Sequence, residues 1–214
     1  MKNITITAYD YNELTEQAKQ RAYNTIYEFL IDFVNDCFYE DTKNGLSDRF
    51  CNSDLDLQYD FSACQGSGLN IYGDFDLRDY LPNYQASEKS KRTIAFYIDT
   101  LKNYNCFDAL KIELSQNHRY TYSCKFVDIK DAEEIAEEIA EELKNIYIKN
   151  IKIDILVDFI KSAYQYIEKQ EDIIFANGEN VFDICDDDVQ EYCAENDIAF
   201  DVSGRIIWAK TIKE

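Results

Sequence analysis

The sequence is poor in the residues that interrupt regular structure, with one proline and six glycines among 214 residues. Since these residues end helices and strands, their scarcity predicts long elements joined by short connections. Histidine occurs once, and the seven cysteines are scattered with no CxxC pair, so we expect neither a metal site nor a bound cofactor. The cysteines are expected to be thiols, most of them buried as small apolar side chains.

Positive charge is scarce as well, because 22 lysine and arginine residues stand against 42 aspartate and glutamate residues and leave a net charge of −20. Proteins hold nucleic acid mainly through lysine and arginine, so this composition argues against direct nucleic-acid binding and favours cationic partners. The one compact basic cluster is Lys89, Lys91 and Arg92.

Long apolar runs are missing too, so the sequence predicts no membrane-spanning helix. The polar amino terminus, MKNITITAYDYNEL, has no apolar signal region, and we expect a cytoplasmic protein. Hydrophobic residues nevertheless make up 46% of the chain, which is enough to build a core.

The spacing of the apolar residues predicts an α+β fold, in which an antiparallel sheet packs with long amphipathic helices and a helical C-terminal lobe ends in a β-hairpin. We expect one compact domain, with a sheet-and-helix core at residues 1–127 and an acidic helical lobe at residues 128–214. Gly45 indicates a turn in a polar loop at residues 41–54. The expected helices are residues 16–34, with a start at Asn12 or Thr15, then residues 89–104, 131–143, 151–168 and 183–197. The expected strands are residues 2–9, 56–63, 69–77, 109–116 and 119–127, and two runs about Ser203 and Gly204.

The stretch DAEEIAEEIAEEL, residues 131–143, places Ile135, Ile139 and Leu143 on one stripe of a helix and glutamates on the other face. Neighbouring glutamates four residues apart lie roughly 6 Å from each other, close to the spacing of phosphates along a nucleic-acid strand. Like charges at this spacing disfavour an isolated helix, so local stability does not explain the pattern. These glutamates are Glu133, Glu134, Glu137, Glu138, Glu141 and Glu142.

A second acidic cluster follows in the same half of the chain and comprises Asp183, Asp186, Asp187, Asp188, Glu191 and Glu195. Of these, Asp186, Asp187, Asp188 and Glu191 are the expected partner-binding residues. If the two acidic helices were neighbours, they would present one broad negative surface about as wide as a duplex. The alternative is that both faces are simply solvated, as most acidic helix faces are.

The connector CQGSG offers a different kind of site. Gln65, Gly66, Ser67 and Gly68 could cradle a phosphate or another small ligand together with His118, since glycines permit the required backbone angles. Cys64 could act as a nucleophile only if the single histidine served as its base. The connector lies between two expected strands, so it also fits a plain hairpin turn.

Several segments occur together in an order that resembles a family of uncharacterised phage and prophage proteins. The family shows a leading LxExAKxxA helix, a QGxG hairpin loop, an HxxxY hairpin and a closing EF..G hairpin. The matching segments here are YDYNELTEQAKQRAYNTI, YDFSACQGSGLNIYG, SQNHRYTYS, and YQYIEKQEDIIFANGENVFD with DIAFDVSGRIIW. Gln65, Gly66 and Gly68 match the loop, Tyr72 and Gly73 match the strand behind it, and His118 and Tyr122 match the third motif. The chain departs from the family at residues 168–190 and in its long glutamate face.

The resemblance implies phage origin and no particular reaction. Small acidic phage proteins often antagonise host nucleases, as anti-CRISPR and anti-restriction proteins do, and by this analogy we expect a non-catalytic inhibitor. It would act in the bacterial cytoplasm, binding a cationic CRISPR effector or restriction nuclease and occluding its nucleic-acid groove. Two alternatives stay open: a ligand-binding protein or enzyme that uses the loop and His118, and a phage structural or regulatory oligomer.

Overall fold

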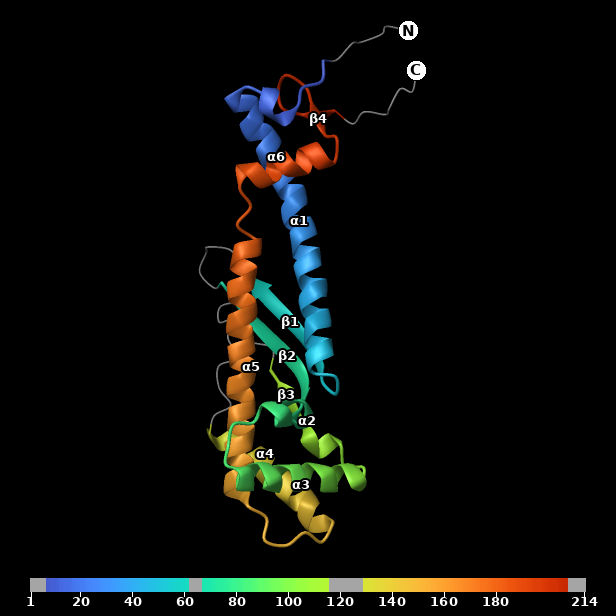
Figure 1. Cartoon of the computed structure of the whole chain (residues 1–214), viewed down its shortest axis with the longest axis vertical. Helices are drawn as coiled ribbons and strands as arrows, with labels where there is room; N and C mark the ends of the chain where they lie inside the picture. Colours follow the sequence, from blue (N-terminus) through green and yellow to red (C-terminus); the bar gives the residue numbers. More distant parts are fainter. Residues whose placement is uncertain (1–6, 62–66, 116–128, 208–214) are drawn as a thin grey trace. The chain divides into compact units, whose positions relative to one another are not determined.

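The computed structural model describes residues 7–61, 67–115 and 129–207, and its contacts divide the chain into two compact units (Figure 1). The terminal unit consists of Met1–Phe38 and Glu179–Glu214, and the central unit of Tyr39–Gly178. The fold is α+β, as predicted from the sequence. The division differs from the expected one at residue 127, because the first part of the chain packs with the last part instead of with the residues that follow it.

Helix α1 runs from Glu16 to Arg49 and contributes to both units. The expected polar loop at residues 41–54 is therefore wrong over most of its length. Leu46 and Phe50 are both buried and lie four residues apart, within the last turn of α1 and just after it, so this side of the helix end packs in the core of the central unit. Gly45 costs a helix about 1 kcal/mol, whereas burying a leucine or phenylalanine contributes about 1.5–3 kcal/mol. The buried face therefore outweighs the glycine.

The terminal unit has a core built from both ends of the chain. Around it lie η1 (Tyr11–Glu13), the first part of α1, α6 (Asp186–Glu195) and a hairpin of β4 (Ala199–Phe200) and β5 (Ile206–Ile207). Tyr9 exchanges backbone hydrogen bonds with Phe200, which ties the N-terminal segment to this hairpin. Its buried residues include Tyr11, Leu14, Ala18, Ala22, Ile26, Leu30, Val189, Cys193 and Phe200.

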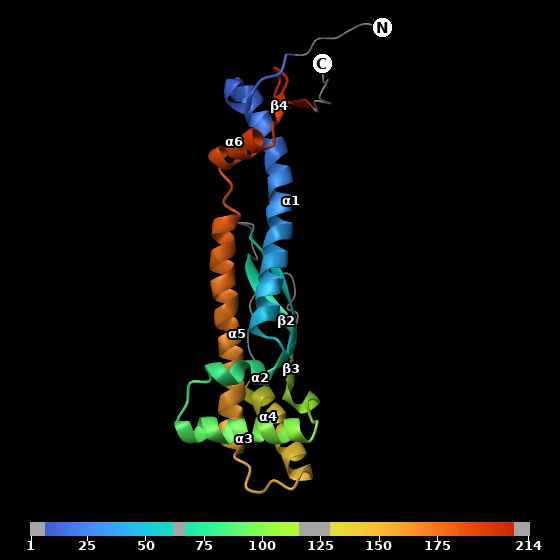
Figure 2. The same cartoon turned by 45° about the vertical axis from the view of Figure 1, so that its right-hand side comes forward.

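The central unit is organised around a three-stranded antiparallel sheet of order β1-β2-β3. Its strands are β1 (Asp54–Asp60), β2 (Gly68–Asp76) and β3 (Lys111–Leu114). The hairpin of β1 and β2 is confirmed, with Leu57 opposite Ile71. Helix α5 runs beside the sheet in both ribbon views (Figures 1 and 2), and residues of both strands are buried.

Helix α5 (Ile153–Val181) is longer than the expected helix at residues 151–168. Two of its polar side chains are buried and bind neighbouring elements of the central unit. The Glu171 carboxylate accepts a hydrogen bond from the backbone N–H of Ile71 at 2.6 Å, and Gln170 accepts one from Arg49 at the end of α1. These two hydrogen bonds stabilise helical residues after position 168, where the sequence pattern predicts no helix.

The remaining helices of the central unit precede α5 in the chain. They are α2 (Leu77–Tyr80), η2 (Leu81–Asn83), α3 (Glu88–Asn103), η3 (Asp108–Leu110) and α4 (Ile129–Asn145). Ser87 caps α3 by accepting a hydrogen bond from the Ser90 backbone, and α4 packs on α3 and η3. Helices α3 and α4 are confirmed near their expected positions, as is α6.

Three helices end at a left-handed backbone conformation that is usually occupied by glycine, but here other residues occupy it. After α3, α4 and α6, the chain turns through a left-handed residue, and these are Asn105, Tyr147 and Asp197. Behind α4, the Ile148 N–H donates to the Leu143 carbonyl and the Tyr147 N–H to the Lys144 carbonyl, the hydrogen-bond pair of a Schellman ending. In a chain with only six glycines, asparagine, tyrosine and aspartate thus adopt this conformation after the helices.

Some expectations fall outside the described residues. These are most of the strand at residues 2–9, the strand at residues 119–127, Cys64 and Cys124. The five described cysteines are free thiols, and only Cys193 is buried, so the expectation of mostly buried cysteines is wrong for this part of the chain. Burial raises the pKa of the Cys193 thiol to about 11, which keeps it protonated at neutral pH.

Candidate functional site

Helix α4 separates apolar and acidic residues on two faces. Ile139 and Leu143 are buried as predicted, together with Ala132, Ala136 and Ala140, while Ile135 is half-buried. The glutamates lie on the other side. Glu133, Glu134, Glu137, Glu138 and Glu141 are exposed, and Glu142 is half-buried. We call these six residues the α4 acidic face.

The carboxylates of the α4 acidic face are unpaired within the described part of the chain. None of them lies within 4.0 Å of a lysine or arginine nitrogen there. Packing on α3 and η3 and the Schellman ending at Tyr147 hold the helix, so the charges are carried by an ordered surface. The arrangement can pair with several cations at once without first breaking internal ion pairs.

The acidic cluster of α6 is organised differently, because Asp186 is engaged inside the terminal unit. Its carboxylate accepts a hydrogen bond of 2.6 Å from the Tyr11 hydroxyl and lies 2.7 Å from the Lys19 ammonium group. The hydrogen bond from Lys19, followed by the one from Tyr11, lowers the pKa of Asp186. Burial and the neighbouring Asp186 raise the pKa of Tyr11. Asp186 therefore joins η1, α1 and α6.

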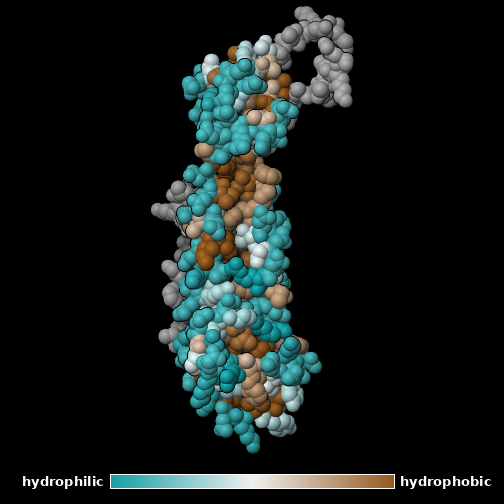
Figure 3. Space-filling view, viewed as in Figure 1, coloured by the Kyte–Doolittle hydropathy of each residue, from teal (hydrophilic) through white to brown (hydrophobic). Residues whose placement is uncertain are grey.

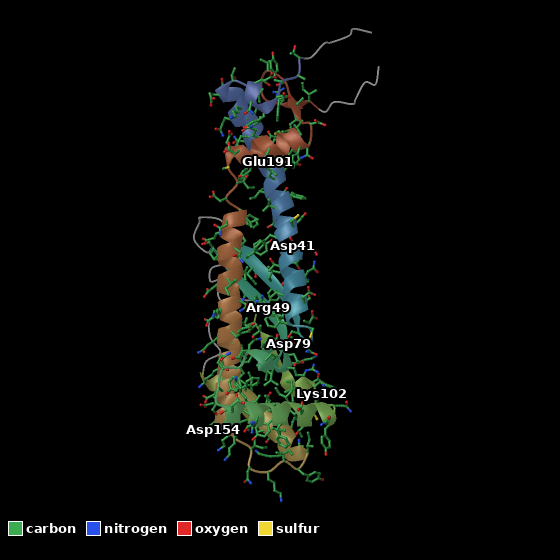
Figure 4. All side chains as sticks on the ribbon, viewed as in Figure 1. Asp41, Arg49, Asp79, Lys102, Asp154 and Glu191 are labelled. Atoms are coloured by element: carbon green, nitrogen blue, oxygen red, sulfur yellow. The ribbon has the colours of Figure 1, made fainter. Side chains whose placement is uncertain are left out.

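Asp188 also has a structural role, since it accepts a hydrogen bond of 2.7 Å from the Cys185 backbone at the start of α6. Its pKa is lowered by hydrogen bonds from the Cys185 side chain and backbone. Asp187 and Glu191 are exposed, and Figure 4 labels Glu191 on α6. Because α4 and α6 belong to different units, each acidic cluster is a surface of its own unit.

Asp186→Asn is expected to lower the free energy of unfolding by about 1 kcal/mol at neutral pH, because Lys19 loses its charged partner while Tyr11 keeps an acceptor. The pKa of Asp186 is lowered in the folded protein. Its charge therefore stabilises fully above the unfolded pKa of about 3.9, and this contribution is lost as the pH falls through the lower folded value. Urea denaturation at a series of pH values measures the difference between the two proteins.

That difference should be constant above about pH 5 and shrink below about pH 4. Asp187→Asn is the matched control, since it removes a neighbouring exposed charge that also acts on Lys19 through space but forms no hydrogen bond or ion pair among the described residues. We expect it to change stability by less than about 0.5 kcal/mol. A loss of equal size in both variants would show that the ion pair contributes nothing specific.

Of the CQGSG connector, the structure describes only the last two residues, Ser67 and Gly68. Gly68 is buried in β2 opposite Asp60 and Ser67 is exposed, whereas Gln65, Gly66 and His118 lie outside the described residues. The hairpin that the connector joins is present. Whether these residues bind a ligand stays a prediction.

An open, shallow cavity of about 690 Å³ forms a further candidate site that no sequence pattern predicts as a whole. It lies between α3 and the connection of α4 to α5, and its lining includes Lys89, Arg92, Lys149 and Lys152. The basic cluster at residues 89–92 indicates one side of this cavity in the sequence. The other side, with Lys149 and Lys152, could not be predicted, because nothing local in the sequence places these two residues beside α3.

Searches against protein-family models, curated proteins and solved structures found no match to this chain. Among the residues that the structure describes, no helix has the length and apolar character needed to cross a membrane. Across the same residues, no three histidine, cysteine, aspartate or glutamate side chains gather closely enough to hold a metal ion.

Proposed function

We propose that this protein is a non-catalytic, phage-encoded inhibitor that acts in the bacterial cytoplasm and binds a cationic nucleic-acid-handling enzyme through the α4 acidic face. The observation that carries the proposal is the row of exposed, unpaired glutamates on an ordered helix. The choice of a CRISPR effector or restriction nuclease as the target rests on the resemblance to phage proteins.

The mechanism is substitution of carboxylates for phosphates. Lysine and arginine side chains that normally hold a nucleic-acid backbone would pair with glutamates spaced roughly 6 Å apart along α4. The net charge of −20 would accelerate encounter with a cationic groove and make association weaken with added salt. Occupation of the groove would exclude the nucleic acid, so inhibition requires no chemical step.

The test is a cleavage assay with a panel of CRISPR effectors and restriction nucleases, using wild-type protein and a triple variant. Glu134→Gln, Glu138→Gln and Glu141→Gln together remove three charges from exposed positions and keep residues of similar helix propensity. At about 0.2–1 kcal/mol per exposed pair, we expect inhibition of the target to weaken by roughly 3- to 150-fold with a shallower salt dependence.

The matched control spreads the same charge change along α1, where Glu16, Glu28 and Glu40 are exposed but twelve residues apart. Replacing these three by glutamine should leave inhibition unchanged. Equal potency of the two triple variants against an inhibited nuclease would show that net charge matters and the α4 row does not. Absence of inhibition across the panel would reject the proposed target class.

A further inference from the structure

The cavity beside α3 gathers positive charge in a protein that is otherwise strongly acidic. Lys89 and Arg92 line it from α3, and Lys149 and Lys152 line it from the connection between α4 and α5, with Glu88 as the one acidic residue in the lining. Within the part of the chain that the structure describes, none of these four cations forms an ion pair. The cavity therefore offers four free positive charges to a ligand.

The helical repeat places the α3 residues together. Lys89, Arg92 and Phe96 follow one another at intervals of three and four residues and share one face of the helix. The opposite face, which includes Ile94, Ile98 and Leu101, is buried. Because that face is anchored in the core of the central unit, the cationic face is held in a defined orientation.

The connection between α4 and α5 is hydrogen-bonded to helix α3. The backbone N–H of Lys152 donates a hydrogen bond of 2.9 Å to the hydroxyl of Tyr97, whose side chain is buried in α3. At its other end, the Schellman ending at Tyr147 and Ile148 fixes where the chain leaves α4. Lys149 and Lys152 thus approach Lys89 and Arg92 on an anchored segment.

An exposed aromatic ring completes the lining. Phe96 is 53% exposed although it is a large apolar residue, and it belongs to the cavity. Figure 3 shows hydrophobic residues among hydrophilic ones at the level of α3. Cations beside an accessible ring suit a ligand that carries negative charge at one end and a flat ring at the other.

We propose that this cavity binds a nucleotide, with the phosphates held by Lys89, Arg92, Lys149 and Lys152 and the base stacked on Phe96. A volume of about 690 Å³ falls in the range of small-molecule sites. The net charge of −20 repels an extended nucleic acid. A compact nucleotide mainly feels the charges within the screening length of about 8 Å at physiological ionic strength. The site is separate from the α4 acidic face and does not depend on the inhibitor proposal.

The test is calorimetric titration of the full chain with ATP, with inorganic tripolyphosphate and with adenosine. ATP should bind with a Kd below about 1 mM and more tightly than either of the other two, because it alone engages both the cations and the ring. Phe96→Ala should weaken ATP by roughly 5- to 150-fold, the range expected for loss of one stacked base, and leave tripolyphosphate unchanged. Lys89→Gln should weaken ATP and tripolyphosphate alike, by roughly 5- to 30-fold.

The matched control is Lys102→Gln, because Lys102 is also an exposed lysine of α3 but lies at its C-terminal end, outside the cavity lining (Figure 4). It is ten residues from Arg92, about 15 Å along the helix axis, and should leave ATP binding unchanged. Circular dichroism verifies that each variant is folded.

Three outcomes would overturn the proposal. They are no saturable ATP binding by the wild type, equal weakening by Lys102→Gln and Lys89→Gln, and tripolyphosphate binding as tight as ATP binding with no effect of Phe96→Ala. Much tighter binding of a single-stranded oligonucleotide than of ATP at this cavity would also contradict the proposal, because the ligand would then be nucleic acid instead of a nucleotide.

Discussion

Replacing Phe50 by alanine is expected to lower the free energy of unfolding by about 3–5 kcal/mol. The Phe50 side chain is 1% exposed at the end of α1. Its ring packs edge-on against Phe75 of β2 and Tyr166 of α5, at centroid distances of 5.5 and 6.2 Å. Truncation would leave a cavity where helix, sheet and helix of the central unit meet. Urea denaturation followed by circular dichroism measures the change.

Phe96→Ala provides the comparison, because Phe96 is the same residue type but is 53% exposed. It should change stability by less than about 0.5 kcal/mol. A loss below about 1 kcal/mol for Phe50→Ala would mean that the site is not enclosed by these three elements. The polar loop expected from the sequence at residues 41–54 would then be the better description.

Replacing Gly204 by alanine is expected to destabilise the terminal unit by roughly 2–4 kcal/mol. Gly204 has φ of +80°, a left-handed conformation that strains an alanine. A Cβ added here would lie 2.0 Å from the backbone carbonyl oxygen of Ala18 in α1. Since a backbone atom cannot move aside as a flexible side chain can, the turn of the β4–β5 hairpin would have to leave α1. The loss would appear as a lower midpoint in urea denaturation.

Gly45→Ala is the matched control and should have the opposite sign. Gly45 lies inside α1, has no positive φ, and an added Cβ would meet no atom within 4 Å. We expect a gain of about 0.5–1 kcal/mol, because alanine loses less conformational freedom in a helix than glycine. A neutral effect of Gly204→Ala would contradict the close approach to Ala18. A loss at Gly45 would contradict the helix there.

The elements that the sequence predicted well are those whose signal is local. Helices α3, α4 and α6 and the β1–β2 hairpin each carry a complete apolar repeat or a turn signal within a short window, and hydrophobic periodicity reports such elements directly. The exposed glutamates and buried Ile139 and Leu143 of α4 follow from the same repeat. Net charge is likewise a property of composition alone.

The misplaced ends have a common physical cause. Gly45 indicated a turn, but Leu46 and Phe50 gain more from burial in the central unit than the glycine costs the helix. Helix α5 passes residue 168 because Gln170 and Glu171 bind Arg49 and Ile71 from elements far away in the sequence.

The amphipathic elements, the α+β class and the acidic surface of α4 can thus be predicted from the amino-acid pattern, because each depends on neighbours within a few turns of chain. The grouping of the two chain ends in one unit and the pairing of Asp186 with Lys19 and Tyr11 are visible in the folded chain alone. The same holds for the meeting of Lys149 and Lys152 with the basic face of α3 in one cavity. These features join residues distant along the chain, and packing and hydrogen bonding select such pairs only once the chain is folded.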